Sequence, residues 1–485
     1  MKKVVKMIFV VIVFLSDYSL VFSQAVMWQR VYDYNGKQTA GRDVIQTFDG
    51  GYIVCGTIVN PVRIYLIKLN YLGIVEWENI IRDSSGAFLQ ALSIKQTFDS
   101  SFIMVGKNES NLCLIRTDKT GNFLWKKNFN EFGGEAIGRA IIITSDAGYL
   151  ACGSIFFPSP ASEKTYVIKT DSLGNLQWEK LYSDSVISNG YDILELPDKK
   201  YYLAGIASSN FANPYHGFLK RLDNDGNLLW NIRFVVNSSI TKLLSLNSKN
   251  LVLGGVAYPS GIFISKVDTA GNIIFQKTLF TSNPEFYFSS MCLNTFQRIA
   301  VGGKERYPEI TGTNDFSACI IDTNGQLLYE KRLNTPKDAD DNCYSIKFTS
   351  DNGYIFVGDS DFNLNREQKD IILVAKTDSL FITTSVLKIA TNISSIENNF
   401  TLHQNFPNPF NNSTIIKYQL KKSSHVLLTL YDITGRHVET LINMNQERNT
   451  YQMNLNTNNL SSGCYFLRLM ADGNLIETKK LYCIK

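Results

Sequence analysis

The chain has 485 residues, about three times the length of a typical domain, so several folding units or one large repetitive unit are expected. Hydrophobic residues make up 44 %, which is enough for a core, and 48 basic against 44 acidic residues leave a net charge of only +4. Such a charge provides no field for capturing nucleic acid, so no nucleic-acid partner is expected. The 24 tyrosines and 30 phenylalanines against 4 histidines favour aromatic β-structure and argue against histidine-based catalysis.

The N-terminus has the pattern of a secretory signal peptide over residues 1–23. Three lysines among the first six residues precede an apolar run that ends at Leu15, and Ser23 stands where a signal peptidase expects a small residue. The run is shorter than the roughly 20 apolar residues that a membrane helix needs, and no later stretch reaches that length. The pattern therefore predicts an exported protein with no transmembrane helix in the mature chain.

Two kinds of β-hairpin alternate along residues 24–381. The first has the form of VIQTFDGGYIVCG (44–56) and occurs seven times. The second has the form of LCLIRTDKTGNFLWKKNF (112–129) and occurs six times. Its fullest turn is Asp-x-x-Gly-Asn, in which Asp caps turn amides and Gly adopts the positive φ of a tight turn. An aromatic residue occupies one position of the strand that follows: Trp77, Trp125, Trp178, Trp230, Phe275 and Tyr329.

Four strands per repeat and seven repeats predict a seven-bladed β-propeller over residues 24–381. The seventh first-type hairpin is followed by a single further strand, while MWQRVY (27–32) offers an unpaired strand with Trp28 in the aromatic slot. An N-terminal strand that completes the last blade would close the ring and remove a free sheet edge. We expect the aromatic slots to form core between blades, with the tryptophan-bearing strands outermost, rather than a ligand cage.

Short, similar turns are expected at one end of this ring and long, dissimilar connections at the other. Aromatic residues in the long connections can stack on sugars or anchor a peptide; alternatively, they fold under and cover the blades. The candidate ligand-binding residues are Phe156, Phe157, Phe211, Tyr215, Tyr258, Phe286, Tyr287 and Tyr307. Asp338, Asp340 and Asp341 are weak calcium candidates through their oxygen ligands, but they lack the spacing of a calcium-binding loop, so no metal is predicted.

No linear catalytic motif is present. His216 is the single histidine of the repeat region, and the chain lacks HExxH, GxSxG and phosphate-binding glycine loops, so no catalytic residue and no cofactor are predicted. RTDKTGNFLW (116–125) resembles the repeat of quinoprotein dehydrogenases and outer-membrane assembly propellers. Those enzymes commonly carry an adjacent cysteine pair, which this chain does not have. Carboxylates from two blades could still meet in the central channel, which leaves a polysaccharide-degrading enzyme as the alternative to a binding module.

Eight cysteines are spread along the chain without tight pair spacing. Cys55 and Cys152 occupy one slot of the repeat, where other repeats have valine, alanine or glycine. This pattern predicts buried thiols. A disulfide between Cys464 and Cys483 is the one pairing left open.

A different module follows the repeat. Residues 382–399 are polar and read as a linker, and residues 400–485 contain QNFPNPFNNST (404–414), LYDITGRHVETL (430–441), NLSSGCYFLRL (459–469) and ETKKLYCIK (477–485). Together these segments resemble the type A C-terminal sorting domain of proteins exported by the type IX secretion system of Bacteroidetes-type bacteria. The matching positions are Asn405, Pro407, Asn408, Pro409, Gly435, Arg436, Gly463 and Lys485.

The resemblance implies passage through the type IX translocon, removal of the module, and either release or attachment at the outer cell surface. Alternating strands separated by turn residues independently predict a small immunoglobulin-like β-sandwich, so an ordinary accessory domain is the alternative. We expect a secreted or cell-surface propeller that binds an extracellular glycan, peptide or polymer.

Overall fold

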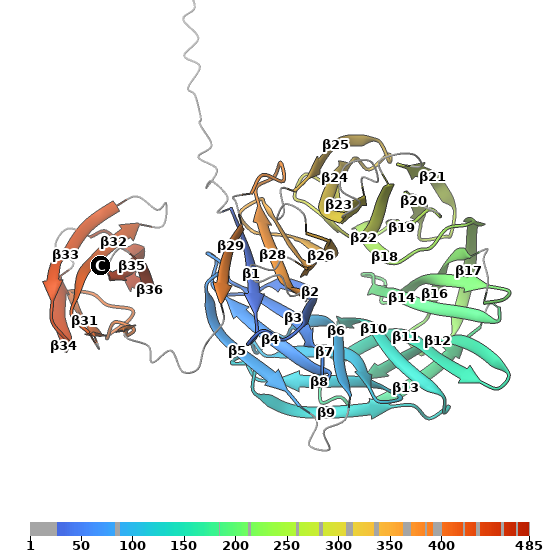
Figure 1. The fold of residues 1–485 in the computed structure, drawn as a ribbon, viewed down its shortest axis with the longest axis horizontal. Helices are drawn as coiled ribbons and strands as arrows, with labels where there is room; N and C mark the ends of the chain where they lie inside the picture. Colours follow the sequence, from blue (N-terminus) through green and yellow to red (C-terminus); the bar gives the residue numbers. More distant parts are fainter. Residues whose placement is uncertain are drawn as a thin grey trace, which may run out of the picture. The chain divides into compact units, whose positions relative to one another are not determined.

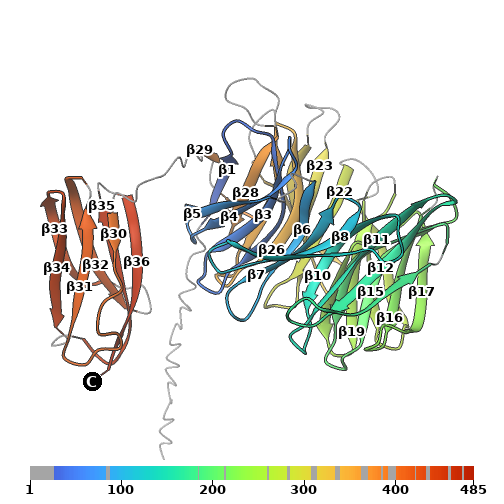
Figure 2. The same cartoon turned by 90° about the horizontal axis from the view of Figure 1, so that it is seen from below.

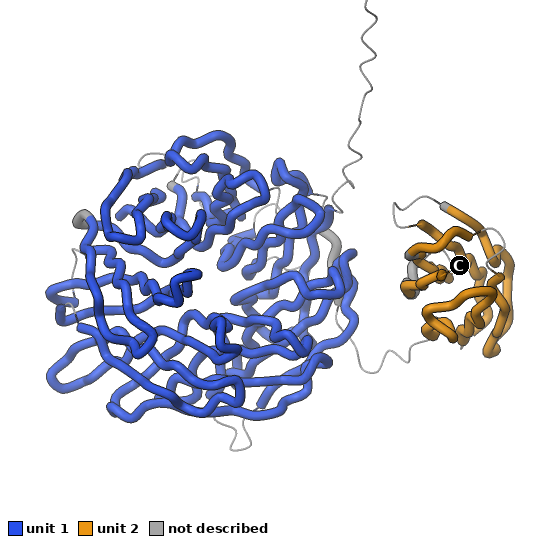
Figure 3. The backbone as a smooth tube through the Cα atoms, turned by 180° about the vertical axis from the view of Figure 1, so that it is seen from behind, with its two compact units in different colours: residues 1–391 blue, residues 392–485 orange. Residues whose placement is uncertain are grey.

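The computed structural model describes residues 27–82, 88–183, 185–211, 215–258, 261–280, 285–306, 314–333, 339–361, 370–383, 386–390, 400–420, 422–432, 437–456, 460–471 and 474–484. The chain separates into two compact units, residues 1–391 and residues 392–485 (Figure 3). Every regular element in these ranges is a β-strand, and none of them contains a helix long and apolar enough to cross a membrane. The predicted signal peptide lies outside the described residues.

The first unit repeats a four-stranded antiparallel sheet in which the strands follow sequence order. The first strand of each group lies nearest the centre and the fourth lies at the rim (Figure 1). Two such groups are β2 (Thr39–Gln46), β3 (Tyr52–Ile58), β4 (Arg63–Leu69) and β5 (Val75–Ile81), and β6 (Leu89–Gln96), β7 (Phe102–Asn108), β8 (Asn111–Thr117) and β9 (Phe123–Phe129). The all-β propeller predicted from the repeat is confirmed.

The next eight strands form one continuous sheet. They are β10 (Glu135–Ile143), β11 (Tyr149–Pro158), β12 (Ala161–Thr170), β13 (Leu176–Tyr182), β14 (Ile187–Glu195), β15 (Tyr201–Ser208), β16 (His216–Leu222) and β17 (Leu228–Val236). The halves are joined by one parallel pair, Glu163 of β12 with Ile187 of β14. Dividing the sheet at this parallel pair gives two more four-stranded groups, β10–β13 and β14–β17.

The remaining strands of the unit continue the same order. They are β18 (Lys242–Asn247), β19 (Asn250–Val256), β20 (Ile262–Asp268), β21 (Ile273–Leu279), β22 (Glu285–Leu293), β23 (Ile299–Arg306), β24 (Asn314–Ile321), β25 (Leu327–Arg332), β26 (Asp341–Phe348), β27 (Tyr354–Ser360) and β28 (Ile371–Thr377). Every residue of β3, β27 and β28 is buried, because neighbouring blades cover both faces of each sheet. Their apolar runs are therefore continuous rather than alternating.

The N-terminal strand β1 (Trp28–Asp33) closes the ring. It pairs antiparallel with β28, as predicted, and thereby completes the last blade. A further strand, β29 (Val386–Ala390), pairs in parallel with the other edge of β1. The prediction of a linker over residues 382–399 is therefore wrong for residues 386–390. Without β29, the outer edge of β1 would expose unpaired backbone N–H and C=O groups; β29 provides their hydrogen-bond partners.

The aromatic slot of one blade packs on a turn of the next. A Cβ built on Gly121 would lie 2.3 Å from the Trp77 ring, and one on Gly73 would lie 2.8 Å from the Trp28 ring. Gly121 also has a φ of +79°, so glycine is required both for conformation and for space. The closing strand thus makes the same contact as the other aromatic strands, and the slots belong to the packing between blades.

The last turn of the unit, residues 378–382, has Phe381 where the other turns have glycine. Its φ is 57°, and Asp378 still accepts hydrogen bonds from the amides of Leu380 and Ile382, at 2.8 Å each. The buried Phe381 ring stacks on Tyr329 with 6.2 Å between centroids. This turn keeps the geometry of the others and supplies a ring to the contact between blades.

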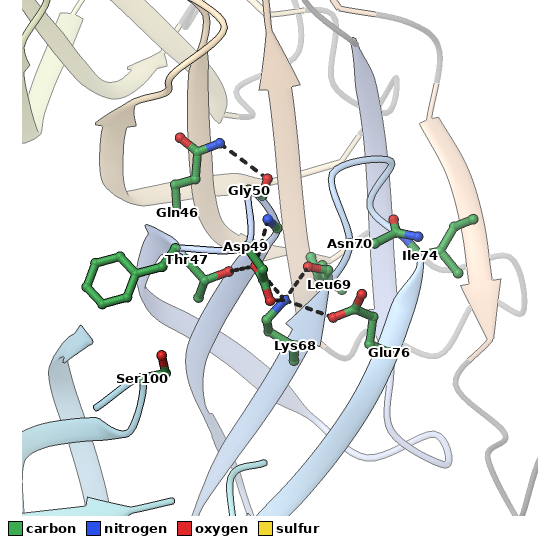
Figure 4. A network of polar contacts seen from close by, with 12 residues as sticks. Gln46, Thr47, Asp49, Gly50, Lys68, Leu69, Asn70, Ile74, Glu76 and Ser100 are labelled. Atoms are coloured by element: carbon green, nitrogen blue, oxygen red, sulfur yellow. Dashed lines mark hydrogen bonds and ion pairs between the residues drawn. The ribbon is translucent and has the colours of Figure 1, made fainter. Parts of the chain in front are cut away.

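Basic side chains of the third strand bind the acidic residue of the first turn at the same end of five blades, and we call this end the turn end. Lys68 lies 3.0 Å from Asp49 of the first turn and 2.8 Å from Glu76, which follows the second (Figure 4). Thr47 and the amide of Gly51 also donate to Asp49. The pairing recurs as Arg116–Asp99, Lys169–Asp146, Arg221–Asp198 and Lys376–Asp351. The opposite end, which carries the longer connections, is called the loop end.

The second unit is a β-sandwich (Figure 2). One sheet contains β30 (Phe400–Leu402), β31 (Ser413–Leu420) and β34 (Asn449–Asn456), and the other contains β33 (His437–Gln446), β32 (Ser424–Asp432), β35 (Gly463–Ala471) and β36 (Asn474–Cys483). Exposed and buried residues alternate strictly along β31, as they do in a strand with one covered face. Its buried side chains pack against those of β32 in a common core.

The described cysteines are buried free thiols, as predicted. They are Cys55, Cys113, Cys152, Cys292, Cys319, Cys343 and Cys483. Burial raises the pKa of Cys292 and of Cys343 to about 12. The side chain of Cys464 lies outside the described residues, and Cys483 forms no disulfide in the structure.

Candidate functional site

The inner strands share a β-bulge at equivalent positions. The pairing of β2 with β3 shifts between Gly41 and Asp43, which leaves Arg42 as an extra residue, and the same shift recurs in β6, β10, β14, β22 and β26. A bulge changes the direction of a side chain and is common beside functional sites. We call the extra residues the bulge ring: Arg42, Leu92, Arg139, Tyr191, Ser289 and Tyr344.

Two members of the bulge ring, Arg139 of β10 and Tyr191 of β14, pack together. The guanidinium lies 4.9 Å from the centroid of the tyrosine ring, within the range of a cation–π interaction. Arg139 also donates to the hydroxyl of Ser154 at 2.6 Å and lies 4.0 Å from Glu163, which accepts a hydrogen bond from Asn189 at 3.0 Å. These contacts from three strands hold the arginine in one orientation.

Tyr191 belongs to a group of three tyrosines from adjacent blades, which we call the tyrosine cluster: Tyr191, Tyr215 and Tyr258. The rings of Tyr215 and Tyr258 are 5.8 Å apart. Their backbones are tied through Asn237, whose amide donates to Tyr215 at 2.7 Å and whose carbonyl accepts from Tyr258 at 2.8 Å. Burial raises the pKa of Tyr258, and the neighbouring Tyr191 and Tyr215 raise it further. Tyr258 nevertheless remains 39 % exposed.

Two predicted loop aromatics form a second pair. The rings of Phe156 and Phe211 meet edge to face with 6.3 Å between centroids, and Phe211 is 51 % exposed. Phe156 lies at the end of β11, and Phe211 lies in the connection between β15 and β16. The structure therefore brings four of the predicted residues into two pairs across neighbouring blades, Phe156 with Phe211 and Tyr215 with Tyr258.

The other predicted loop aromatics do not join this group. Phe286 is only 2 % exposed and stacks on Phe280 at 5.3 Å, and Phe157 packs against the core between blades. These two follow the alternative in which loop aromatics cover the blades, because β11 and β22 extend into the connections and carry them into the sheets. Tyr287 lies under Lys304 at 5.6 Å, and Tyr307 lies outside the described residues.

A second arginine–tyrosine pair of the bulge ring joins the first and last blades. Arg42 of β2 lies 4.9 Å from the ring centroid of Tyr344 of β26. Beside them, burial raises the pKa of Asp359 to about 6, with further repulsion from Asp370, while a hydrogen bond from Asn342 and the Tyr344 hydroxyl lower it. A carboxyl group with this pKa exchanges a proton near neutral pH.

Asp340, one of the weak calcium candidates, is engaged in contacts within the protein. Asp340 accepts hydrogen bonds from the amide and the side chain of Asn314 at 3.0 Å and 2.5 Å, and its own amide donates to Asp361 at 2.6 Å. Asp341 is buried in β26, and Asp338 lies outside the described residues. Among the residues that the structure describes, no group of three or more histidine, cysteine or acidic side chains is placed to hold a metal ion.

Two asparagines of the sorting motif, Asn405 and Asn408, hold backbone segments of the C-terminal module in place. Asn405 is 2 % exposed and donates to the carbonyl of Pro407 at 3.1 Å and to Thr414 at 2.9 Å. Asn408 donates to the carbonyl of Lys480 at 3.0 Å and accepts from the amide of Tyr482 at 2.8 Å. Together these contacts hold the segment around Pro409 against β36. Gly463 pairs with Cys483, whereas Gly435, Arg436 and Lys485 lie outside the described residues.

The model of the secretion system C-terminal sorting domain family matches residues 404–484. Residues 404–484 form a type IX sorting domain. Proteins that carry this domain are recognised by the type IX secretion system and are secreted or attached to the outer cell surface. The predicted export route and destination of the chain are confirmed.

Solved propeller-like structures resemble the fold distantly. Streptogramin B lyase has a TM-score of 0.49 at 13 % identity, covering 73 % of this chain and 100 % of its own. PorZ, an essential surface component of the type IX secretion system of Porphyromonas gingivalis, has a TM-score of 0.40 at 11 % identity, covering 90 % of this chain and 58 % of its own. Sqt1 from Chaetomium thermophilum has a TM-score of 0.44 at 11 % identity, covering 81 % and 97 %. No curated protein matches the chain.

None of the bulge-ring residues is among the ligand-binding residues predicted from the sequence. A signal for it exists, because Gly-Arg-Asp (41–43), Gly-Arg-Ala (138–140) and Gly-Tyr-Asp (190–192) occupy the same position ahead of the first hairpin turn. The strand pattern alone does not reveal it, since an extra residue is recognised only when the partner strand's register is known.

Proposed function

We propose that the chain is an exported binding module whose loop end takes an extracellular polymer, with a glycan as the best match. The tyrosine cluster carries the proposal. Flat rings offer stacking surfaces to sugars, while Arg139, Glu163 and Asn189 beside them supply hydrogen-bond donors and acceptors. A peptide is the other class of ligand that such a surface suits.

Binding is tested with the purified full chain on a panel of immobilised polysaccharides and peptides. Tyr191→Ala and Tyr258→Ala should each weaken retention by about tenfold or more, as expected when a central aromatic contact is lost. Phe98→Ala is the matched control, because Phe98 is an exposed ring, 86 % accessible, at the turn end. Equal loss in Phe98→Ala and Tyr258→Ala would contradict the assignment of binding to the loop end.

The sorting domain gives the proposal its cellular context. Removal of the module after translocation and subsequent release or surface attachment follow the type IX route that residues 404–484 specify. A chain that lacks residues 400–485 should accumulate in the periplasm. Normal amounts of the truncated chain at the surface or in the medium would refute the sorting role.

A polymer-degrading enzyme is the second candidate, and Asp359 is the observation that favours it. Burial raises its pKa to about 6, which suits a general acid. By contrast, Asp43 in the channel is kept ionised, because Lys347 and the other nearby lysines outweigh its burial and hold its pKa well below the usual range. Release of sugars from a polysaccharide by the full chain, abolished in Asp359→Asn with binding retained, would establish this candidate over a binder without turnover.

A further inference from the structure

A belt of charged residues lies on the inner strands, one or more positions beyond the bulge ring. We call it the charged belt, and its members are Asp43, Lys95, Asp192, Lys242 and Lys347. They come from β2, β6, β14, β18 and β26, which surround the centre of the ring in Figure 1. Inner strands from blades that are far apart in sequence therefore carry these charged residues around the centre of the ring.

The two carboxylates of the charged belt are used to join blades. Asp43 accepts from the hydroxyl of Ser345 at 2.8 Å, pairs with Lys347 at 3.2 Å, and accepts from the amide of Ile94 at 3.2 Å. It therefore links the last blade, the first and the second. Asp192 accepts from the amide of Leu243 at 2.9 Å, which links it to the following blade.

Unlike the two carboxylates, the three lysines of the charged belt do not all have partners in the described residues. Lys347 is bound to Asp43 and to the hydroxyl of Ser345, at 2.8 Å from the latter. In the described part of the chain, neither Lys95 nor Lys242 forms a hydrogen bond or an ion pair, and both are half-buried, so that solvent reaches them. Burial lowers the pKa of Lys95, Asp43 and Asp192 raise it, and Lys347 and Lys242 lower it. The geometry agrees with this charge balance, because all three lysines lie on inner strands and only Lys347 has a carboxylate partner in the described residues.

We propose that Lys95, Lys242 and Lys347 form an anion-binding site at the centre of the propeller. Three cations face two carboxylates that are already engaged with neighbouring blades, which leaves two ammonium groups with donors to spare. A compact oxyanion supplies the missing counter-charge and accepts several charge-assisted hydrogen bonds at once. The oxyanion is either a free ion such as sulfate or the carboxylate of a sugar acid, and the site is independent of the tyrosine cluster.

The test is thermal unfolding of the full chain in sodium sulfate and in sodium glucuronate, each against sodium chloride at the same ionic strength. A ligand that binds the folded state raises the Tm in a saturable way, whereas the general stabilisation of proteins by sulfate does not saturate. A saturable response to sulfate alone identifies a free-ion site, and a response to glucuronate identifies a sugar carboxylate. Either supports the proposal, and the lack of both overturns it.

Substitutions of single lysines test whether the rise in Tm with the anion depends on the charged belt. Lys95→Gln and Lys242→Gln should raise the apparent Kd of the responding anion by roughly tenfold or more, as the loss of a charge-assisted contact requires. Their Tm in chloride should be unchanged or higher, because each change removes a mutually repelling charge. Lys95→Arg keeps the charge and should retain binding.

The matched control is Lys277→Gln, since Lys277 lies on the rim strand β21, where it donates to the carbonyl of Asn324 at 2.7 Å. Its anion response should equal that of the unaltered chain. If Lys95→Gln unfolds the protein, Lys242→Gln and Lys95→Arg still decide the question. An unchanged Kd in Lys242→Gln, or an equal loss in Lys277→Gln, overturns the proposal.

Discussion

The two ends of the propeller are built by the same strands and differ in which contacts repeat. At the turn end, an aspartate paired with a lysine or arginine recurs from blade to blade, as in Lys68–Asp49 and Lys376–Asp351. At the loop end, the pair Arg139–Tyr191 joins the blades that begin with β10 and β14, and the pair Arg42–Tyr344 joins the first and last blades. Contacts shared by most blades hold a ring together, whereas contacts particular to one or two blades are free to serve recognition.

Exposure of aromatic side chains does not by itself separate the two ends. Phe48 and Phe98 at the turn end are 67 % and 86 % exposed, more than Tyr258 at the loop end. At the turn end, Arg116 lies over the ring of Tyr149 in the next blade, but it is held there by Asp99, which belongs to the recurring turn contact. At the loop end, the pair Arg139–Tyr191 lies next to the further rings of Tyr215 and Tyr258, which the described residues of the other blades do not repeat. A site is therefore indicated by a group of side chains that is particular to these blades rather than by a single exposed ring.

The largest effect on stability is expected where a turn meets the aromatic slot. Gly121→Ala should cost about 3 kcal/mol of unfolding free energy, because the new methyl group overlaps the Trp77 ring and the residue keeps a positive φ. Gly36→Ala is the control, since Gly36 has a φ of +66° but no atom within 4 Å of a built Cβ, and its cost should be about 1 kcal/mol. Urea unfolding of both variants measures the difference, and equal costs would show that packing between blades contributes little.

A smaller effect is expected where a buried lysine loses its partner. Asp351→Asn should cost about 2 kcal/mol, because Lys376 is fully buried and its ion pair with Asp351 is the one that balances its charge in the described structure. Asp99→Asn should cost less than about 1 kcal/mol, because Asp99 is mostly exposed and Arg116 keeps contact with solvent. Comparable losses in urea unfolding would contradict this ranking of the turn-end pairs.

The ion pair between Asp351 and Lys376 also predicts how the stability of the chain depends on pH. Burial opposes ionisation of Asp351, but hydrogen bonds from Thr349 and Lys376 outweigh it and lower its pKa. The unfolded chain therefore takes up this proton first as the pH falls, so stability present above about pH 4 is lost below it. The decline in Tm between roughly pH 5 and pH 2 should be shallower in Asp351→Asn than in the unaltered chain. If Tm falls equally with pH in both proteins, the ionisation of Asp351 does not contribute to the acid dependence of stability.

The smallest effect on stability is expected at the loop end. Tyr258→Ala should change the unfolding free energy by about 1 kcal/mol or less, because the side chain is 39 % exposed and lies outside the buried clusters of the blades. The same variant should lose ligand retention. A large loss of stability would mean that the tyrosine cluster serves the ring, as the turn-end contacts do, and would blur the contrast between the two ends.

Patterns that are local in the sequence were enough to predict the repeat, the closing strand and the sorting domain. The turn glycines and aspartates recur at a nearly constant spacing, and their geometry depends on neighbouring residues only. Trp28 was recognisable as a displaced member of the aromatic slot for the same reason. The burial of the Cys55 and Cys152 thiols also followed from position in the repeat, because both occupy one slot of the second strand, and this strand is covered on both faces.

The tertiary structure alone decided which side chains from different blades meet. The pairing of β29 with β1 depends on an edge that exists only after the ring has closed, and the role of Phe381 depends on the position of Tyr329. The direction of Arg139 depends on a bulge that is defined by the register of two strands. Burial of Phe286, exposure of Phe211 and the contacts of Asp43 with the last and second blades likewise depend on residues distant in the chain, which spacing along the sequence does not encode.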